Sequence, residues 1–195
     1  MTRSPARPSR VGAVLAAVLL VAGCGGSAPE MFDLTAPAVP AARAMRAQLS
    51  IREPTASLDL DSQRILVRTG PETVAYLSGA EWSDKLPTLV QTRLLQTFQN
   101  ARLIKSVARS GTGVEADYSL ELDIQAFELD AKAVAAQVAI VAKIIDRRGG
   151  RIVAARLFKA QVASKGTGGP EAAAALNAAL STVLTQIVDF AAAQI

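Results

Sequence analysis

The chain of 195 residues contains no histidine, one cysteine and one tryptophan. Without histidine, and with a single thiol, it lacks the usual zinc ligands and the base of a Ser-His-Asp or Cys-His nucleophile pair. Its aspartates and glutamates are spread along the expected strands and helix ends with no obvious pairing. The composition therefore predicts a protein that is not an enzyme and has no catalytic residues, no metal ligands and no bound cofactor.

Aromatic residues are also scarce, at 4% of the chain, although 50% of its residues are hydrophobic. The core must therefore be built from alanine, valine, leucine and isoleucine. These residue types are ample for a sheet covered by helices, an arrangement that buries one face of each element.

The single cysteine, Cys24, ends an N-terminal segment with the layout of a secretory signal. Arginines at positions 3, 7 and 10 precede a short apolar stretch, residues 11–21, which is too short to span a bilayer. The motif Val21-Ala22-Gly23-Cys24 resembles a lipobox, in which the cysteine sulfur receives a diacylglycerol and the signal is cleaved before it. An ordinary cleaved signal or a membrane-spanning anchor would leave the position of the only thiol unexplained.

We therefore expect residues 1–23 to be a signal peptide and Cys24 to carry covalent lipid that holds the chain on a membrane. Gly25 stands where an aspartate commonly retains lipoproteins in the inner membrane, so the motif resembles an outer-membrane sorting signal. Three of the 21 basic residues lie in the signal and none of the 17 acidic ones do, which leaves a net charge of +1. Nucleic-acid binding is not expected at that charge.

Glycine, alanine and proline dominate the stretch after the cysteine, and they oppose regular structure. They predict a lipidated tether at residues 24–45, followed by one domain at residues 46–195. Within the tether, Met31, Phe32 and Leu34 are more apolar than a linker needs. We expect these three residues to dock on the domain as an edge segment.

Alternating apolar and polar residues predict six strands. Gly70-Pro71 and Gly149-Gly150 mark turns of two hairpins, and Pro54 ends the first strand. The predicted strands are residues 48–52, 64–68, 73–77, 118–126, 134–144 and 152–162. In the last three, even-numbered residues from Tyr118 to Ala126, Val134 to Ile144 and Ile152 to Val162 are expected to share a face, with Arg156 as a polar interruption.

Two amphipathic helices complete the pattern. Ser83 and Asp84 are candidate N-caps for the first helix, which ends near Asn100 and carries Pro87 in its first turn. A glycine-rich loop precedes the second helix, residues 171–195, whose wide apolar stripe is long enough to cover much of a sheet. The sequence thus predicts an α+β fold in a single domain: a mostly antiparallel sheet covered by two main helices.

This order of elements, together with the lipobox, resembles the ABC-type transport auxiliary lipoproteins, the PqiC-like family. Residues 63–98 carry the most specific likeness: an Ile65–Arg68 strand ending in Val-Arg, then Tyr76, Trp82 and the pair Leu86-Pro87. The start at residues 31–34 is similar to the family's aromatic-x-Leu opening, with Met31 where an aromatic residue is common.

The resemblance implies a non-catalytic outer-membrane lipoprotein that faces the periplasm and serves a lipid or hydrophobic-solute transport system. Its implied partners are an MCE-domain protein and an ABC transporter permease and ATPase, with a possible homo-oligomer. This chain has no Walker motif, so the ATPase is expected on another protein. Two alternatives remain: a lipoprotein that carries lipid in a cavity between sheet and helices, and an envelope-assembly or cell-wall-binding lipoprotein.

Arg68, Tyr76 and Trp82 are the candidate partner-binding residues, because exposed Trp, Tyr and Arg are enriched at interface hot spots. The structural alternative is that Trp82 packs the strand–helix junction, Tyr76 lies on a strand face and Arg68 is solvated.

Overall fold

The computed structural model describes residues 28–42, 45–103 and 105–195. They form one open sheet of nine strands and two helices, so the predicted single α+β domain with a mostly antiparallel sheet is confirmed. The signal peptide and Cys24 lie outside the described residues. The elements are β1 (Glu30–Phe32), β2 (Leu49–Ile51), β3 (Thr55–Ala56), β4 (Arg64–Gly70), β5 (Thr73–Trp82), α1 (Leu86–Asn100), β6 (Val107–Arg109), β7 (Tyr118–Asp130), β8 (Ala135–Asp146), β9 (Arg151–Ala163) and α2 (Gly169–Gln194).

Strand β7 lies in the middle of the sheet and pairs with β2, β3, β4 and β8. On one side it pairs antiparallel with β8, which pairs antiparallel with β9. On its other side β2, β3 and β4 pair with successive parts of β7, all in parallel. The sheet then continues from β4 through β5 to β1, and from β2 to β6. This side of β7 therefore forks into two branches.

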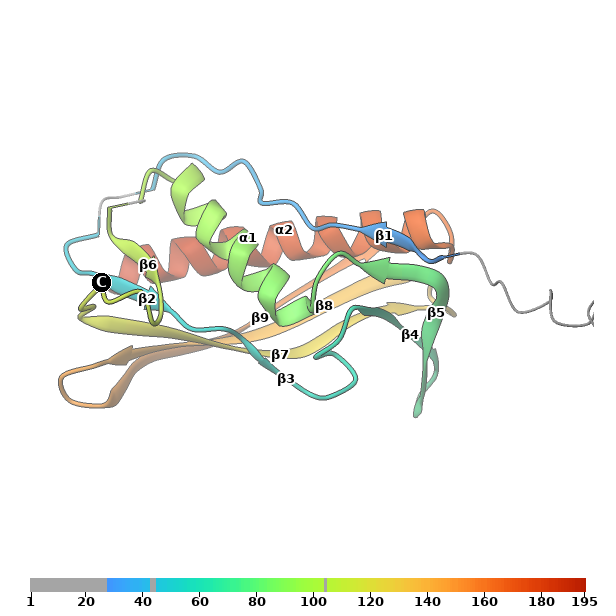
Figure 1. The fold of residues 1–195 in the computed structure, drawn as a ribbon, viewed down its shortest axis with the longest axis horizontal. Coiled ribbons are helices and arrows are strands. Elements are labelled where there is room, and N and C mark those ends of the chain that lie inside the picture. Colours follow the sequence, from blue (N-terminus) through green and yellow to red (C-terminus); the bar gives the residue numbers. More distant parts are fainter. Residues whose placement is uncertain (1–27, 43–44, 104) are drawn as a thin grey trace, which may run out of the picture.

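Both helices lie on the same face of the sheet, and the opposite face is left open (Figure 1). Helix α2 packs along β8 and β9 and also contacts α1. Its length and mean hydropathy of 1.3 would suit a membrane span by composition, but half of that stretch is buried inside the domain. The apolar stripe of α2 is thus accounted for by the core.

Helix α1 has the predicted apolar face, with Leu86, Val90, Leu94 and Phe98 all buried. The predicted N-caps are wrong, because Lys85 occupies the cap position and no side chain caps the helix. The Asp84 carboxylate instead accepts the neighbouring Lys85 N–H at 2.7 Å. The Leu86 N–H donates to the carbonyl of Ser62, so a distant loop supplies a bond that a cap would otherwise make.

The apolar edge segment predicted near residue 31 is present. Strand β1 pairs in parallel with β5, and Leu34 is buried in the core. Residues 30–34, which belong to the stretch assigned to the tether, therefore pack with the domain ahead of residue 46.

Three face assignments are wrong for local backbone reasons. The register between β7 and β8 shifts between Ile124 and Ala126, which moves Ala126 to the open face opposite Ala139. A second shift on β9 places Ile152 opposite Ile145 and hence on the open face. Val134 precedes β8 in a turn, with a φ of 48°.

Candidate functional site

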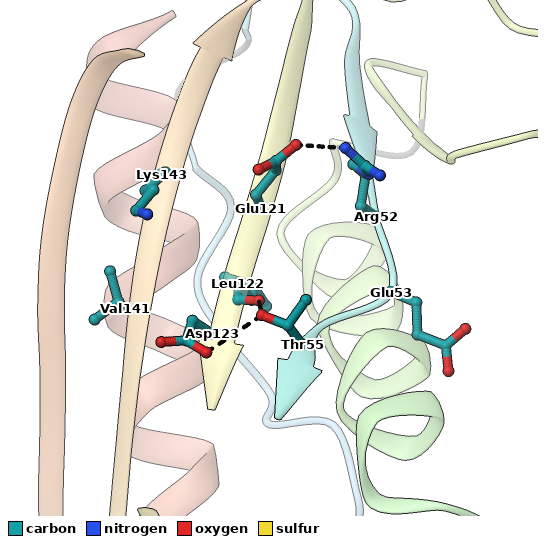
Figure 2. A pocket seen from close by; sticks show the side chains of 8 residues that line it. All are labelled: Arg52, Glu53, Thr55, Glu121, Leu122, Asp123, Val141 and Lys143. Atoms are coloured by element: carbon teal, nitrogen blue, oxygen red, sulfur yellow. Dashed lines mark hydrogen bonds and ion pairs between the residues drawn. The ribbon is translucent and has the colours of Figure 1, made fainter. Parts of the chain in front are cut away.

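The open face of the sheet carries a hollow at the junction of β2, β3, β7 and β8. Its volume is about 190 Å³. Charged side chains from these elements surround it (Figure 2). The lining residues are Arg52, Glu53, Thr55, Glu121, Leu122, Asp123, Val141 and Lys143.

The two carboxylates of β7 in this hollow are already engaged. Arg52 Nη1 donates to Glu121 Oε1 at 2.7 Å, and the Thr55 hydroxyl donates to Asp123 Oδ1 at 3.2 Å (Figure 2). These contacts fasten the short strands β2 and β3 to β7. A hollow of this size takes water or a small polar group, and it is far too small for a lipid chain.

Arg68 lies on the same open face, where it forms an ion pair that the sequence did not predict. Its Nε and Nη2 donate to the two carboxylate oxygens of Glu128 at 2.6 and 2.9 Å. The Glu128 side chain is only 6% exposed, while Arg68 is one-third exposed. Hydrogen bonding to Glu128 and the charge of that carboxylate raise the pKa of Arg68. The expectation that Arg68 is simply solvated is wrong.

Tyr76 is the cross-strand neighbour of Leu66 and shares the open face with Arg68. The guanidinium of Arg64 lies 3.5 Å from the centre of the Tyr76 ring, a cation–π geometry. The Tyr76 hydroxyl donates to the carbonyl of Asp59 at 3.4 Å. Tyr76 is half-buried, so part of its ring remains open to contact by another molecule.

Trp82 lies on the other face of the same strand. Its side chain is 1% exposed and meets Phe127 edge to face, with ring centres 5.8 Å apart. The reversal of face comes from an irregular stretch of β5 between Tyr76 and Glu81, where Gly79 has a φ of 71°. The structure therefore places Arg68 and Tyr76 on one face of the sheet and leaves Trp82 in the core, so the two aromatics do not form an exposed pair.

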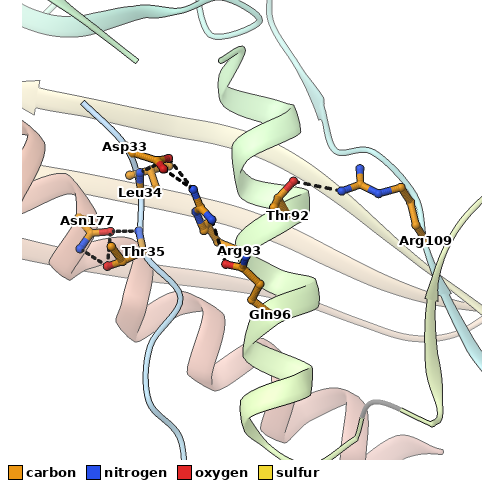
Figure 3. Close-up of polar contacts among 8 residues, drawn as sticks. All are labelled: Asp33, Leu34, Thr35, Thr92, Arg93, Gln96, Arg109 and Asn177. Carbon is orange, nitrogen blue, oxygen red and sulfur yellow. Dashed lines mark hydrogen bonds and ion pairs between the residues drawn. The ribbon is translucent and has the colours of Figure 1, made fainter. Parts of the chain in front are cut away.

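A polar network on the helix side fastens the N-terminal segment to both helices (Figure 3). Arg93 of α1 binds the carboxylate of Asp33. The Thr35 backbone N–H donates to the side-chain oxygen of Asn177 in α2 at 2.8 Å. A separate contact fastens β6 to α1: Arg109 donates to the hydroxyl of Thr92 at 3.1 Å. None of these residues was predicted from the sequence, because their partners lie far along the chain and no local pattern marks them.

The layer between the sheet and α2 is closely packed. A side chain with no accessible surface borders no void large enough to hold a water molecule. Side chains of this kind line both elements: Ala136, Val138, Ile140, Ala142 and Ile144 on β8, and Leu176, Leu180, Val183, Leu184 and Ile187 on α2. The alanines here serve close packing. Over the residues that the structure describes, no cluster of three or more acidic, cysteine or histidine side chains is placed to hold a metal ion.

This chain, with an open mixed sheet under two helices, belongs to the ABC-type transport auxiliary lipoprotein component family, whose model matches residues 32–188. A curated protein of Bradyrhizobium diazoefficiens, bll6063, is 32% identical over 173 residues. The alignment covers 84% of this chain and 46% of that protein, so the chain spans about half the length of this relative.

Two solved structures share the fold. The crystal structure of XCC0632 from Xanthomonas campestris, a DUF330 family protein, superposes with a TM-score of 0.72 at 29% identity. That match covers 86% of this chain and 94% of the other. A second crystal structure has a TM-score of 0.67 at 12% identity and covers 85% of this chain and 99% of its own, a likeness of fold alone.

Proposed function

We propose that this chain is the non-catalytic outer-membrane lipoprotein of an MCE/ABC-type system that moves lipids or other hydrophobic solutes across the periplasm. The observation that carries the proposal is the family match over residues 32–188, which accounts for nearly all of the domain. The ABC transporter permease and ATPase and the MCE-domain protein are the proposed partners. The chain's own role is to contact them from a lipid anchor on Cys24.

The lipid anchor would hold one end of the domain close to the membrane. Only four residue steps separate Cys24 from Ala28, the first residue that the structure describes. A fully extended chain of that length spans about 14 Å. Strand β1 follows at one end of the sheet, and the C-terminus lies at the other end (Figure 1). The end with the C-terminus would therefore face away from the membrane and toward periplasmic partners.

The close packing between β8 and α2 gives no support to a lipid carrier with its cavity in that layer. A lipid chain would have to displace side chains that are fully buried against one another. That would cost the burial free energy of each, about 1.5–3 kcal/mol for a Leu, Val or Ile side chain. A non-catalytic component that binds its partner proteins through its surface needs no such rearrangement.

The proposal is tested by purifying the full-length chain from its native membranes and identifying co-purified proteins. We expect an MCE-domain protein with its ABC transporter, and we expect Cys24→Ser to release the chain from the membrane. Gly25→Asp is the matched control, because it keeps the lipid while altering the proposed sorting signal. Recovery of peptidoglycan, with no transport protein, would contradict the proposed function and favour cell-wall binding.

Lipidation of Cys24 is tested by separate measurements of precursor processing and lipid labelling. Globomycin, an inhibitor of the lipoprotein signal peptidase, should leave the precursor uncleaved, and labelled palmitate should enter the wild-type chain but not Cys24→Ser. Unchanged processing and no label would remove the anchor from the proposal.

A further inference from the structure

Strand β9 forms a long edge of the sheet. One side of Arg151–Ala163 pairs with β8, and no strand within the described ranges pairs with its other side. From Ala154 to Ala163 the pairing with β8 runs without a register shift. The outer side therefore offers a regular row of backbone N–H and C=O groups, which is the template for adding another strand.

The side chains on this edge are unusually apolar for a solvent-facing strand. Ile152, Val153 and Leu157 are 58%, 48% and 43% exposed. Leu157 lies on the open face beside Val141, and Ile152 beside Ile145. Single exposed apolar residues are ordinary, but three of them within six positions of one unpaired edge offer an added strand apolar side chains to cover.

All ionisable side chains of β9 are basic. They are Arg151, Arg156 and Lys159, and all three are exposed. Over the described part of the chain, none of them takes part in a salt bridge. Asp146 lies opposite Arg151, and Asp189 borders the same hollow as Arg156. The edge thus presents apolar side chains flanked by cations that are available to an acidic partner.

A second copy of this chain fits the edge poorly. All side-chain charges of β9 are positive, so pairing β9 with β9 of another copy forms no ion pair between the two strands and is opposed in any register that sets two basic residues opposite each other. The other strands with an unpaired side in the described part of the chain are β1, β3 and β6, which have two or three residues each and so cannot match β9 in length. The chain's own first 29 residues contain no aspartate or glutamate, so they do not match the charge of β9 either.

We propose that the β9 edge binds an extended acidic segment of a different protein, which adds to the sheet as a further strand. Backbone hydrogen bonds supply the register. Carboxylates of the segment lie beside Arg156 and Lys159, and its apolar residues cover Leu157 and Ile152. The inference does not depend on the proposed transport role, because it follows from the edge and its charges alone.

The test places a photoreactive benzoylphenylalanine at Leu157 in the full-length chain, produced in the cells that naturally encode it. Irradiation is followed by mass-spectrometric mapping of the cross-linked peptide. The expected product joins position 157 to an extended segment of another protein in which Asp and Glu residues are interspersed with apolar ones, because Arg156 and Lys159 lie on opposite faces of β9 and Leu157 lies on the same face as Lys159. Moving the probe to Ala155 should shift the cross-link by two residues along the same segment, as strand pairing requires.

Charge variants test whether the cross-link depends on the positive charges of Arg156 and Lys159. We expect R156E/K159E to lower the cross-link yield about tenfold, because two attractive contacts become repulsive. The matched control R46E/K105E changes the same residue types at exposed sites outside β9 and should lower the yield less than about twofold. Changing the captured carboxylates of the partner to lysine should restore cross-linking to R156E/K159E. The variant R156Q/K159Q repeats the comparison by removing the two charges without reversing them. Only variants with the wild-type melting temperature are compared.

Three results would overturn the inference: no adduct, an adduct with a second copy of this chain, or equal losses in the β9 variant and its control. Capture of an acidic segment from a protein unrelated to transport would support this inference while counting against the proposed function. Failure to capture any segment would leave the co-purification with transport proteins unaffected.

Discussion

Arg93 holds both carboxylate oxygens of Asp33, with Nη2 at 2.6 Å from Oδ1 and 2.5 Å from Oδ2. The same guanidinium donates from Nη1 to Gln96 at 2.9 Å. This contact joins the middle of α1 to the residue that follows β1, across 60 residues of sequence. It therefore secures the segment that leads from the proposed lipid anchor into the domain.

The ion pair predicts a stability that depends on acid pH. Partial burial would raise the pKa of Asp33, but hydrogen bonds from Arg93 and the Leu34 N–H, together with the charge of Arg93, lower it below 3.8. Since the folded pKa is the lower one, the stabilisation is complete above the unfolded value and is lost as pH falls through the folded value. Asp33→Asn should lower the free energy of unfolding at pH 7 by about 1 kcal/mol, because Asp33 is half exposed.

Urea unfolding of the two proteins from pH 7 to about pH 2 measures this difference. The gap between wild type and Asp33→Asn should close at the acid end of that range. Glu72→Gln, an exposed carboxylate in the β4–β5 turn, controls for the loss of one surface charge. A gap of constant size over the whole range would show that the Asp33 carboxylate charge is not what stabilises the fold.

The Arg68–Glu128 pair predicts a different mutational pattern. Arg68→Met should lower the free energy of unfolding by about 3 kcal/mol, because it leaves the buried Glu128 carboxylate without its cation. Replacing both residues by methionine should cost much less, since no unpaired charge remains. Arg68→Lys should fall between the wild type and Arg68→Met, because an ammonium cannot donate two parallel hydrogen bonds. Equal losses in the single and double methionine variants would refute this account of the pair.

Local patterns in the sequence were sufficient for the long elements. Strands β7, β8 and β9 and both helices were predicted because each has a periodic apolar face, and β4 because it has a short apolar run before a turn. Strands β3 and β6 were missed, since they have two and three residues and exist through parallel pairing with β7 and β2. Such pairing is fixed by the tertiary arrangement, which a local pattern does not contain.

The candidate partner-binding residues show the same limit, because the sequence identifies the residues but not the faces on which they lie. The sequence singled out Arg68, Tyr76 and Trp82, but strict alternation along one strand would place Tyr76 and Trp82 on the same face. The irregular stretch at Gly79 reverses that relationship. The partner of Arg68, Glu128, is 60 residues away, so only the parallel register of β4 and β7 reveals it. Whether these residues bind a partner stays a prediction.

Val134 predicts a stabilising substitution. It is a β-branched residue with a φ of 48°, in a turn that was assigned to a strand because valine continues the apolar alternation. Its carbonyl accepts the Ser164 N–H, a bond that does not depend on the side chain. Val134→Asn or Val134→Gly should raise the free energy of unfolding by about 1 kcal/mol, because the left-handed conformation costs them less. Thermal unfolding measures this, and a lower melting temperature in both variants would contradict it.

Trp82 gives the sharpest test of the core. Trp82→Ala should lower the free energy of unfolding by about 3–5 kcal/mol, because it opens a cavity beside Phe127. Trp82→Phe should cost about 1–2 kcal/mol, since the ring contact is partly kept. Circular dichroism during urea unfolding is the suitable measurement, because Trp82 is the only tryptophan and its fluorescence is lost in both variants.

Co-purification with the proposed transport partners tests the same residue as a binding residue. It should survive Trp82→Phe, because Trp82 is buried, whereas Tyr76→Ala tests the half-exposed ring directly. A loss of co-purification with Trp82→Phe, at a temperature where this variant is fully folded, would show that a partner contacts this residue.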